Sequence, residues 1–158
     1  MPIPKTHPVT MTSTKNTAFV LVPGSFSPAT YYEKVIPYLE ADGYEAVAVS
    51  LPSCNADDKR NERPATMLDD AAAISNVASK LADKGKNVVV AMHSYGGFPG
   101  TESSKGLSKA ERQQQSKEGG IVALVYLAAW LPTEGMSTYQ MSGEPDVVKN
   151  AVSICVLI

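Results

Sequence analysis

The stretch "MHSYGG", residues 92–97, holds the side chains best suited to chemistry. Ser94 lies between His93 and Tyr95, directly after an apolar Val-rich run and before a glycine-rich segment that can start a helix. A tight strand-to-helix turn holds such a serine in a strained conformation and presents its hydroxyl above the sheet, the arrangement called a nucleophile elbow. We therefore take Ser94 as the candidate nucleophile for attack on a carbonyl carbon.

The residues after Ser94 suit such an elbow. Gly96 satisfies the need for a small residue where the chain doubles back, and Gly97 gives the following helix room against the strands. The backbone N–H of Tyr95 lies at the start of that helix and points to where an oxyanion would form. Tyr95 is therefore the first candidate oxyanion donor.

A second donor is expected from the glycine loop "VPGSFSPAT", residues 22–30, which follows an earlier strand. The candidate is the backbone N–H of Ser25 or Phe26. Two alternatives stay open: Gly24 only forms a turn, or the loop binds a phosphate, although it lacks the G-x-x-x-x-G-K-[ST] and G-x-G-x-x-G patterns.

Four short apolar runs are typical of strands buried on both faces of a parallel sheet. They cover residues 18–22, 45–51, 87–92 and 121–131. Helical patterns separate them. This alternation predicts the α/β fold class, with a three-layer, doubly wound, mostly parallel sheet.

The clearer helix is predicted over Thr66–Lys84, with a capping box of Thr66 and Asp69 and a stop at Gly85. A second helix is predicted over Tyr31–Asp42, where Pro37 must lie near the first turn or kink the helix. The polar segment 105–120 is interpreted as a solvated surface connector.

Composition narrows the function. The chain has 158 residues and a formal charge of −2, so it fits one domain and carries no basic field for nucleic acid. Cys54 and Cys155 form neither a disulfide framework nor a zinc motif, and neither a cofactor nor a metal is expected. No window approaches the roughly 18 apolar residues of a membrane span, and residues 1–17 do not resemble a signal peptide. We expect a cytoplasmic protein with a small, roughly neutral partner.

Three segments carry a family resemblance: "FVLVPGSFSPATYYEKVIPYLEADGYEAVAVSLPS", "VVVAMHSYGGFPGTES" and "IVALVYLAAWLPTEG". Together they resemble the N-terminal half of an α/β-hydrolase of the small esterase, lactonase and hydroxynitrile-lyase-like group. The resemblance implies that Ser94 is the nucleophile and that Tyr95, with Ser25 or Phe26, supplies the oxyanion hole. It implies a small ester or lactone as substrate.

The resemblance also implies a domain organisation. A disordered leader would cover residues 1–17, and a partial α/β-hydrolase domain residues 18–135. The start of a lid-like region and an atypical tail would cover residues 136–158.

Two features depart from the family pattern. Met92 stands where G-x-S-x-G has glycine, so we expect its side chain to pack between the sheet and the helix. No histidine follows Ser94, although the fold orders its triad as Ser, acid, His. His93 is expected to point away from the Ser94 hydroxyl, and ordering His7 would cost about 1–2 kcal/mol per residue. The chain alone is therefore predicted to be a weak hydrolase or an inactive one.

The carboxylates offer no clear triad acid. Those after the fourth apolar run are interpreted as solvated loop groups. They are Glu134, Glu144 and Asp146. Those before Ser94 are interpreted as charges in a loop or at the start of a helix. They are Asp57, Asp58, Asp69 and Asp70.

The apolar end "DVVKNAVSICVLI" has two interpretations. Val152–Ile158 could add a strand to the sheet, whose open edge would otherwise favour self-association. Alternatively, it is a foreign tail on a truncated or misread coding sequence, which we favour because the resembled fold needs about a hundred more residues. The functional alternatives to an enzyme are a non-catalytic small-molecule binder and a truncated product without independent function.

Overall fold

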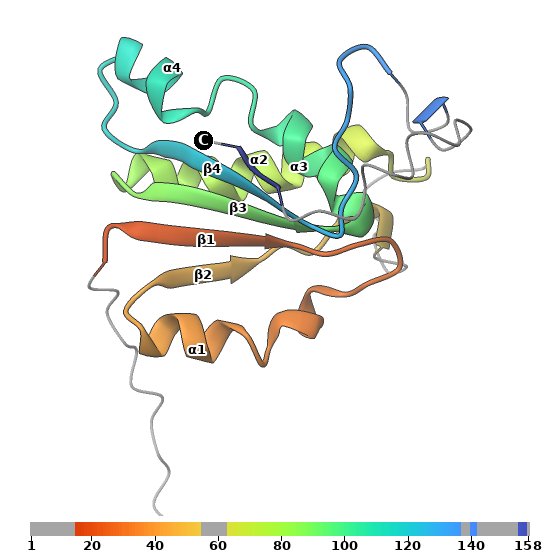
Figure 1. Ribbon diagram of the computed structural model, residues 1–158, viewed down its shortest axis with the longest axis horizontal. Coiled ribbons are helices and arrows are strands. Elements are labelled where there is room, and N and C mark those ends of the chain that lie inside the picture. Colours follow the sequence, from red (N-terminus) through yellow and green to blue (C-terminus); the bar gives the residue numbers. More distant parts are fainter. Residues whose placement is uncertain (1–14, 55–62, 137–139, 142–154, 158) are drawn as a thin grey trace, which may run out of the picture.

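The computed structural model describes residues 15–54, 63–136, 140–141 and 155–157. They form a five-stranded sheet in the order β2-β1-β3-β4-β5. The first four strands are parallel, and β5 is antiparallel to β4. The strands are β1 Thr17–Val22, β2 Glu45–Ala48, β3 Asn87–His93, β4 Gly120–Leu127 and β5 Cys155–Leu157. The predicted α/β class with a mostly parallel sheet is confirmed (Figure 1).

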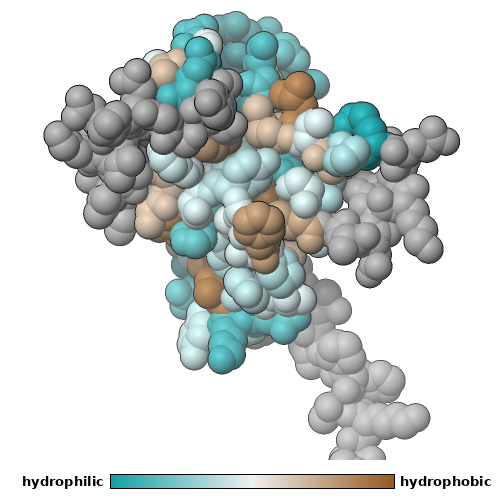
Figure 2. Space-filling model, turned by 90° about the vertical axis from the view of Figure 1, so that its right-hand side faces the viewer, coloured by the Kyte–Doolittle hydropathy of each residue, from teal (hydrophilic) through white to brown (hydrophobic). Residues whose placement is uncertain are grey.

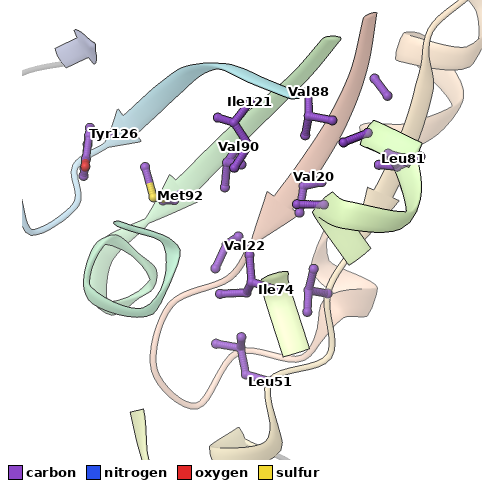
Figure 3. Close-up of a cluster of buried hydrophobic side chains, with 14 of the residues drawn as sticks. Val20, Val22, Leu51, Ile74, Leu81, Val88, Val90, Met92, Ile121 and Tyr126 are labelled. Atoms are coloured by element: carbon purple, nitrogen blue, oxygen red, sulfur yellow. The ribbon is translucent and has the colours of Figure 1, made fainter. Parts of the chain in front are cut away.

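The core lies where the apolar runs of β1 and β3 face the long helix α2, Met67–Asp83. Figure 3 shows side chains from these strands gathered with Ile74 and Leu81 of α2. Val20, Val90 and Ile74 are fully buried. Burial of such side chains contributes about 1.5–3 kcal/mol each, which fixes β3 at the centre of the fold.

The long helix begins as predicted. Thr66 and Asp69 form the capping box, and the Asp69 carboxylate accepts the Thr66 N–H across 2.7 Å. Gly85 follows with a φ of +80°, a left-handed conformation that suits glycine and ends the helix.

The predicted helix over residues 31–42 is shorter than expected. A 3-10 turn, η1, covers Ala29–Tyr32, and α1 covers only Ile36–Ala41. Pro37 lies in the first turn of α1, where its missing N–H leaves no intrahelical bond unmade.

Two strands end earlier than their apolar runs. β2 ends at Ala48, and Val49 and Leu51 continue as buried chain into the 3-10 turn η2, Pro52–Cys54. β4 ends at Leu127, and Ala128 then has a φ of +45°, which turns the chain out of the sheet. The apolar runs therefore overestimated the strand lengths: Val49 and Leu51 stay buried beyond β2, whereas Ala128 and Leu131 beyond β4 are exposed.

The segment 105–120 is more than a solvated connector. It contains α4, Lys109–Gln114, which opens with a second capping box of Ser108 and Glu111. Arg112 is buried and donates hydrogen bonds to the Gly119 carbonyl and to Asp83. The expectation of a purely solvated segment was wrong because one long basic side chain anchors it. The remaining helix, α3, covers Gly97–Ser103.

The chain near its ends contacts the sheet. Lys15 donates its N–H to the Gly43 carbonyl, and Thr17 already belongs to β1. Cys155–Leu157 pair with Tyr126–Leu124 of β4, as the added-strand interpretation expects. The foreign-tail interpretation stays a prediction, as does self-association. Residues 1–14 of the expected leader lie outside the described part. Within the described part, no helix is long and apolar enough to cross a membrane.

Candidate active site

Ser94 lies at a sharp bend between β3 and the helical chain that follows. The strand ends at His93, a 3-10 turn η3 covers Ser94–Gly96, and α3 continues from it. Ser94 has a φ of +52°, which costs a non-glycine residue on the order of 1–3 kcal/mol. The residue is only half-buried. The chain therefore forms a tight elbow between strand and helix at the carboxyl end of a central strand.

The two glycines after Ser94 lie against backbone atoms. A Cβ on Gly96 would come within 2.6 Å of the Pro23 carbonyl oxygen, and one on Gly97 would overlap the carbonyl group of Trp130. Neither backbone can move without disturbing β1 or the segment after β4. Both positions therefore exclude any side chain, which is the local reason for the glycine pair.

The glycine loop after β1 packs directly against the elbow. A Cβ on Gly24 would lie 3.0 Å from Ser94 Cβ and 3.2 Å from His93 Nδ1. Ser27 donates its N–H to the Gly24 carbonyl, which closes a turn around Ser25 and Phe26. Within the described part of the chain, the N–H groups of these two residues donate to no protein acceptor. The structure thus packs Gly24, the residue before the candidate donors Ser25 and Phe26, against Ser94.

Phe26 combines two unusual features in this loop. Its φ is +57°, and its side chain is 93% exposed. The loop follows the carboxyl end of β1, on the right of Figure 1, and Figure 2 views the molecule from that side and shows hydrophobic residues among polar ones. An aromatic side chain in a strained turn that buries almost nothing is available to contact a bound molecule.

The segment after β4 holds the elbow from its other side. Trp130 donates its backbone N–H to the Ser94 carbonyl across 3.1 Å. Its ring stacks on Phe98 of α3, with the ring centroids 5.9 Å apart. Sequence analysis did not identify Trp130, because the contact depends on the register of β3 and β4.

Met92 packs as expected. It is fully buried, and its thioether fills the space beside Gly100 of α3, where a Cβ would overlap the Met92 sulfur. A glycine in the following helix therefore accommodates the large residue that replaces the usual glycine before the serine.

Asp70 lies in the first turn of α2, as its interpretation as a helix-entry charge expects, but it also has hydrogen-bond partners that the sequence did not indicate. It is fully buried and accepts hydrogen bonds from Ser53 N–H at 2.9 Å, Ser53 Oγ at 2.6 Å and Tyr95 Oη at 2.8 Å. Burial, together with the Asp70 carboxylate, raises the pKa of the Tyr95 phenol, so the phenol stays protonated and a donor well into the alkaline range. The signal that could have found Asp70 is its place four residues before buried Ile74, on the same face of α2.

Asp69, one residue earlier, behaves as expected for a charge at a helix start. Besides capping α2, it forms an exposed ion pair with Arg63 across 2.9 Å. The Arg63 side chain and the hydrogen bonds from Thr66 hold the pKa of Asp69 well below its usual range.

The other candidate acids and bases are not brought to Ser94. His93 is exposed, and its ring faces Gly24; among the described residues, no imidazole or carboxylate hydrogen-bonds the Ser94 hydroxyl. Glu134 is exposed and lines a hollow with Phe98 and Met136 whose lining does not include Ser94. The remaining candidates lie outside the described residues: His7, Asp57, Asp58, Glu144 and Asp146. No cluster of metal-ligating side chains occurs among the residues that the structure places.

Comparison with known proteins agrees with this geometry. The model of the Alpha/beta hydrolase family matches residues 19–152. The chain therefore belongs to the alpha/beta hydrolase family, which confirms the resemblance read from its motifs.

Curated relatives match at moderate identity. "Probable hydrolase R7" of Phoma sp. is 38% identical over 125 residues, which are 78% of this chain and 47% of that protein. "Alpha/beta hydrolase nvfD" of Aspergillus novofumigatus is 35% identical over 112 residues, which are 71% and 42% of the two chains. The chain thus spans less than half the length of these relatives.

Solved structures share the fold. Polyneuridine aldehyde esterase superposes with a TM-score of 0.62 at 25% identity, over 82% of this chain and 47% of that one. Tomato methylketone synthase I, complexed with 2-tridecanone, gives 0.58 at 18% identity, over 85% and 46%. The family match and the hydrolase-named relatives support assigning the chain to the hydrolases, without a more specific activity.

Proposed function

We propose that this chain provides the nucleophile and the oxyanion hole of a carboxylic ester hydrolase acting on a small ester or lactone. The observation that carries the proposal is the strained bend at Ser94, φ +52°, with the Gly24 loop packed against it. Family membership supports hydrolysis, and the resemblance to small esterases and lactonases supports an ester or lactone as the substrate.

The proposed reaction begins with attack of the Ser94 oxygen on the ester carbonyl carbon while its proton passes to a base. The N–H of Tyr95 and that of Ser25 or Phe26 stabilise the negative oxygen of the tetrahedral intermediate. The intermediate expels the alcohol and leaves an acyl group on Ser94. Water then attacks the acyl carbonyl and releases the acid, which restores the serine.

The lack of a base hydrogen-bonded to Ser94 lowers the turnover rate that we expect. Among the described residues His93 is the sole histidine, its ring faces Gly24, and it makes no hydrogen bond to the Ser94 hydroxyl. In serine hydrolases, loss of the base costs up to about a millionfold in turnover, while the oxyanion hole and binding keep about 10³–10⁴-fold over water. We therefore propose very slow turnover by the chain as given.

A different candidate function is a small-molecule binder without catalysis. The exposed Phe26 side chain in the glycine loop favours it. Tight binding of a small ester with no acid released, in wild type and in Ser94→Ala alike, would indicate this function.

The test is covalent labelling by a fluorophosphonate probe, with and without added imidazole. The proposal expects slow labelling of the wild type, an increase with imidazole as the external base, and none in Ser94→Ala. Equal labelling of wild type and Ser94→Ala would contradict the proposal, and so would a wild type that imidazole leaves unlabelled.

A further inference from the structure

We propose that Asp70 is a positioning residue for the oxyanion hole: through the Tyr95 phenol it holds the Tyr95 backbone N–H in the place where that group donates. The catalytic consequence rests on the proposed function. The structural link itself can be tested without it.

The first step is that Asp70 is buried without a cation. Its carboxylate is fully buried, and the donors that reach it in the described part of the chain are neutral groups of Ser53 and Tyr95. Asp69 already caps α2, so the helix start does not require a second carboxylate. Because apolar replacements of buried charges are often neutral or stabilising, stability alone gives little reason for an aspartate here.

The second step is that Tyr95 connects Asp70 to the elbow. Tyr95 directly follows Ser94, and its hydroxyl donates to Asp70 Oδ2 across 2.8 Å. Its ring also lies 6.4 Å from that of Phe98, between centroids. A side chain fixed at its far end restrains the backbone of its own residue. Since the Trp130 N–H holds the Ser94 carbonyl, the elbow is held at both residues.

The third step is that the Asp70 carboxylate is also linked, through Ser53 and Cys54, to the glycine loop that carries the second candidate donor. Ser53 donates both its N–H and its hydroxyl to Asp70. Its neighbour Cys54 places its sulfur 3.9 Å from the Gly24 carbonyl oxygen, at the base of the glycine loop. Asp70 is therefore linked to both parts of the proposed oxyanion hole: to the Tyr95 N–H through the Tyr95 side chain, and to the glycine loop through Ser53 and Cys54.

The variants separate positioning from folding. Tyr95→Phe keeps the ring and removes only the hydroxyl. Asp70→Ala removes the acceptor, and Asp70→Asn keeps one acceptor oxygen. Asp69→Ala is the matched control, because it weakens the start of the same helix without touching Tyr95.

The first readout is amide hydrogen exchange of the full chain, followed residue by residue in ¹⁵N spectra. We expect Tyr95→Phe and Asp70→Ala to speed exchange at residue 95 about tenfold relative to Lys80, the fold-change expected when a charge-assisted hydrogen bond is lost. Asp70→Asn should recover most of the protection, and Asp69→Ala should not single out residue 95. Unchanged exchange at residue 95 in Tyr95→Phe would overturn the proposal, even if Asp70→Ala does not fold.

The second readout is the rate of Ser94 labelling by the fluorophosphonate. The maximal rate should fall about tenfold in Tyr95→Phe with the half-saturating probe concentration unchanged, a fraction of the roughly 10²–10³-fold loss for a deleted oxyanion donor. A rise in the half-saturating concentration at constant maximal rate would contradict positioning. If wild type is not labelled, the proposed function fails, and the exchange measurement still decides the role of Asp70.

Discussion

The backbone N–H of Trp130 donates a hydrogen bond to the carbonyl oxygen of Ser94, and 3.1 Å separates the two atoms. This bond joins the chain leaving β4 to the bend leaving β3. The Trp130 carbonyl meanwhile leaves no room for a side chain on Gly97. The conformation of Ser94 is therefore fixed by a neighbouring strand as well as by its own turn.

The closeness of Trp130 predicts that Gly97→Ala is strongly destabilising. A Cβ there would overlap the carbonyl of Trp130, and overpacking of a rigid site costs about 1–3 kcal/mol or more. Gly106→Ala is the control, since its Cβ meets no atom within 4 Å and only its φ of +72° is unfavourable. Urea unfolding followed by circular dichroism measures both variants. Equal losses in the two variants would count against the packing seen at Gly97.

Met92 should be costly to shorten. It is fully buried against α3, so Met92→Ala should lower the free energy of unfolding by about 2–4 kcal/mol. Met136 is 36% exposed, and Met136→Ala should cost less than about 0.5 kcal/mol. Thermal melts of the two variants make the comparison, and a Met92→Ala protein as stable as wild type would show that this residue does not fill the space between β3 and α3.

Phe26 should be nearly dispensable for stability. Its side chain is 93% exposed, and a glycine would relieve the positive φ, while the larger conformational entropy of the unfolded chain would offset this gain by a similar amount. Phe26→Gly is therefore expected to change the free energy of unfolding by less than about 0.5 kcal/mol. Its effect should fall on ligand binding, measured as the half-saturating concentration of an aromatic ester. A fold-wide loss of stability would mean that Phe26 packs against something in solution.

Acid should weaken the fold through two aspartates on the helix α2. Hydrogen bonds from Arg63 and Arg112 hold the pKa values of Asp69 and Asp83, respectively, below the ordinary range. A depressed carboxyl pKa stabilises the folded state above the unfolded pKa, near 3.9, and this contribution is lost as the pH falls through the acid range. Stability measured from pH 6 downward should fall less steeply in Asp69→Asn and Asp83→Asn. Slopes identical to wild type would contradict a contribution of these two ion pairs to the loss of stability in acid.

The elbow could be predicted from sequence because its signals are local. A Val-rich run, one serine and two glycines specify a strand, a bend and a close approach within a few residues. The capping box of α2 is local in the same way. Such features depend on nearest neighbours along the chain, which sequence reasoning treats well.

Contacts between distant segments escaped sequence reasoning. Asp70 looks like any acidic residue in a first helical turn until Ser53 and Tyr95 are placed beside it. Trp130 meets Ser94 only in the register that pairs His93 with Leu127. The short helix α4 was missed because its anchoring residue, Arg112, is charged and gives no apolar period. In each case the missing information was three-dimensional proximity.

Peptide mass spectrometry of the chain after fluorophosphonate treatment in imidazole buffer tests the central claim most directly. If the bend at residue 94 makes its hydroxyl the nucleophile, one adduct per chain should form, on the peptide that contains Ser94, and it should be absent from Ser94→Ala. Adducts spread over other serines, or an equal yield in Ser94→Ala, would contradict the account.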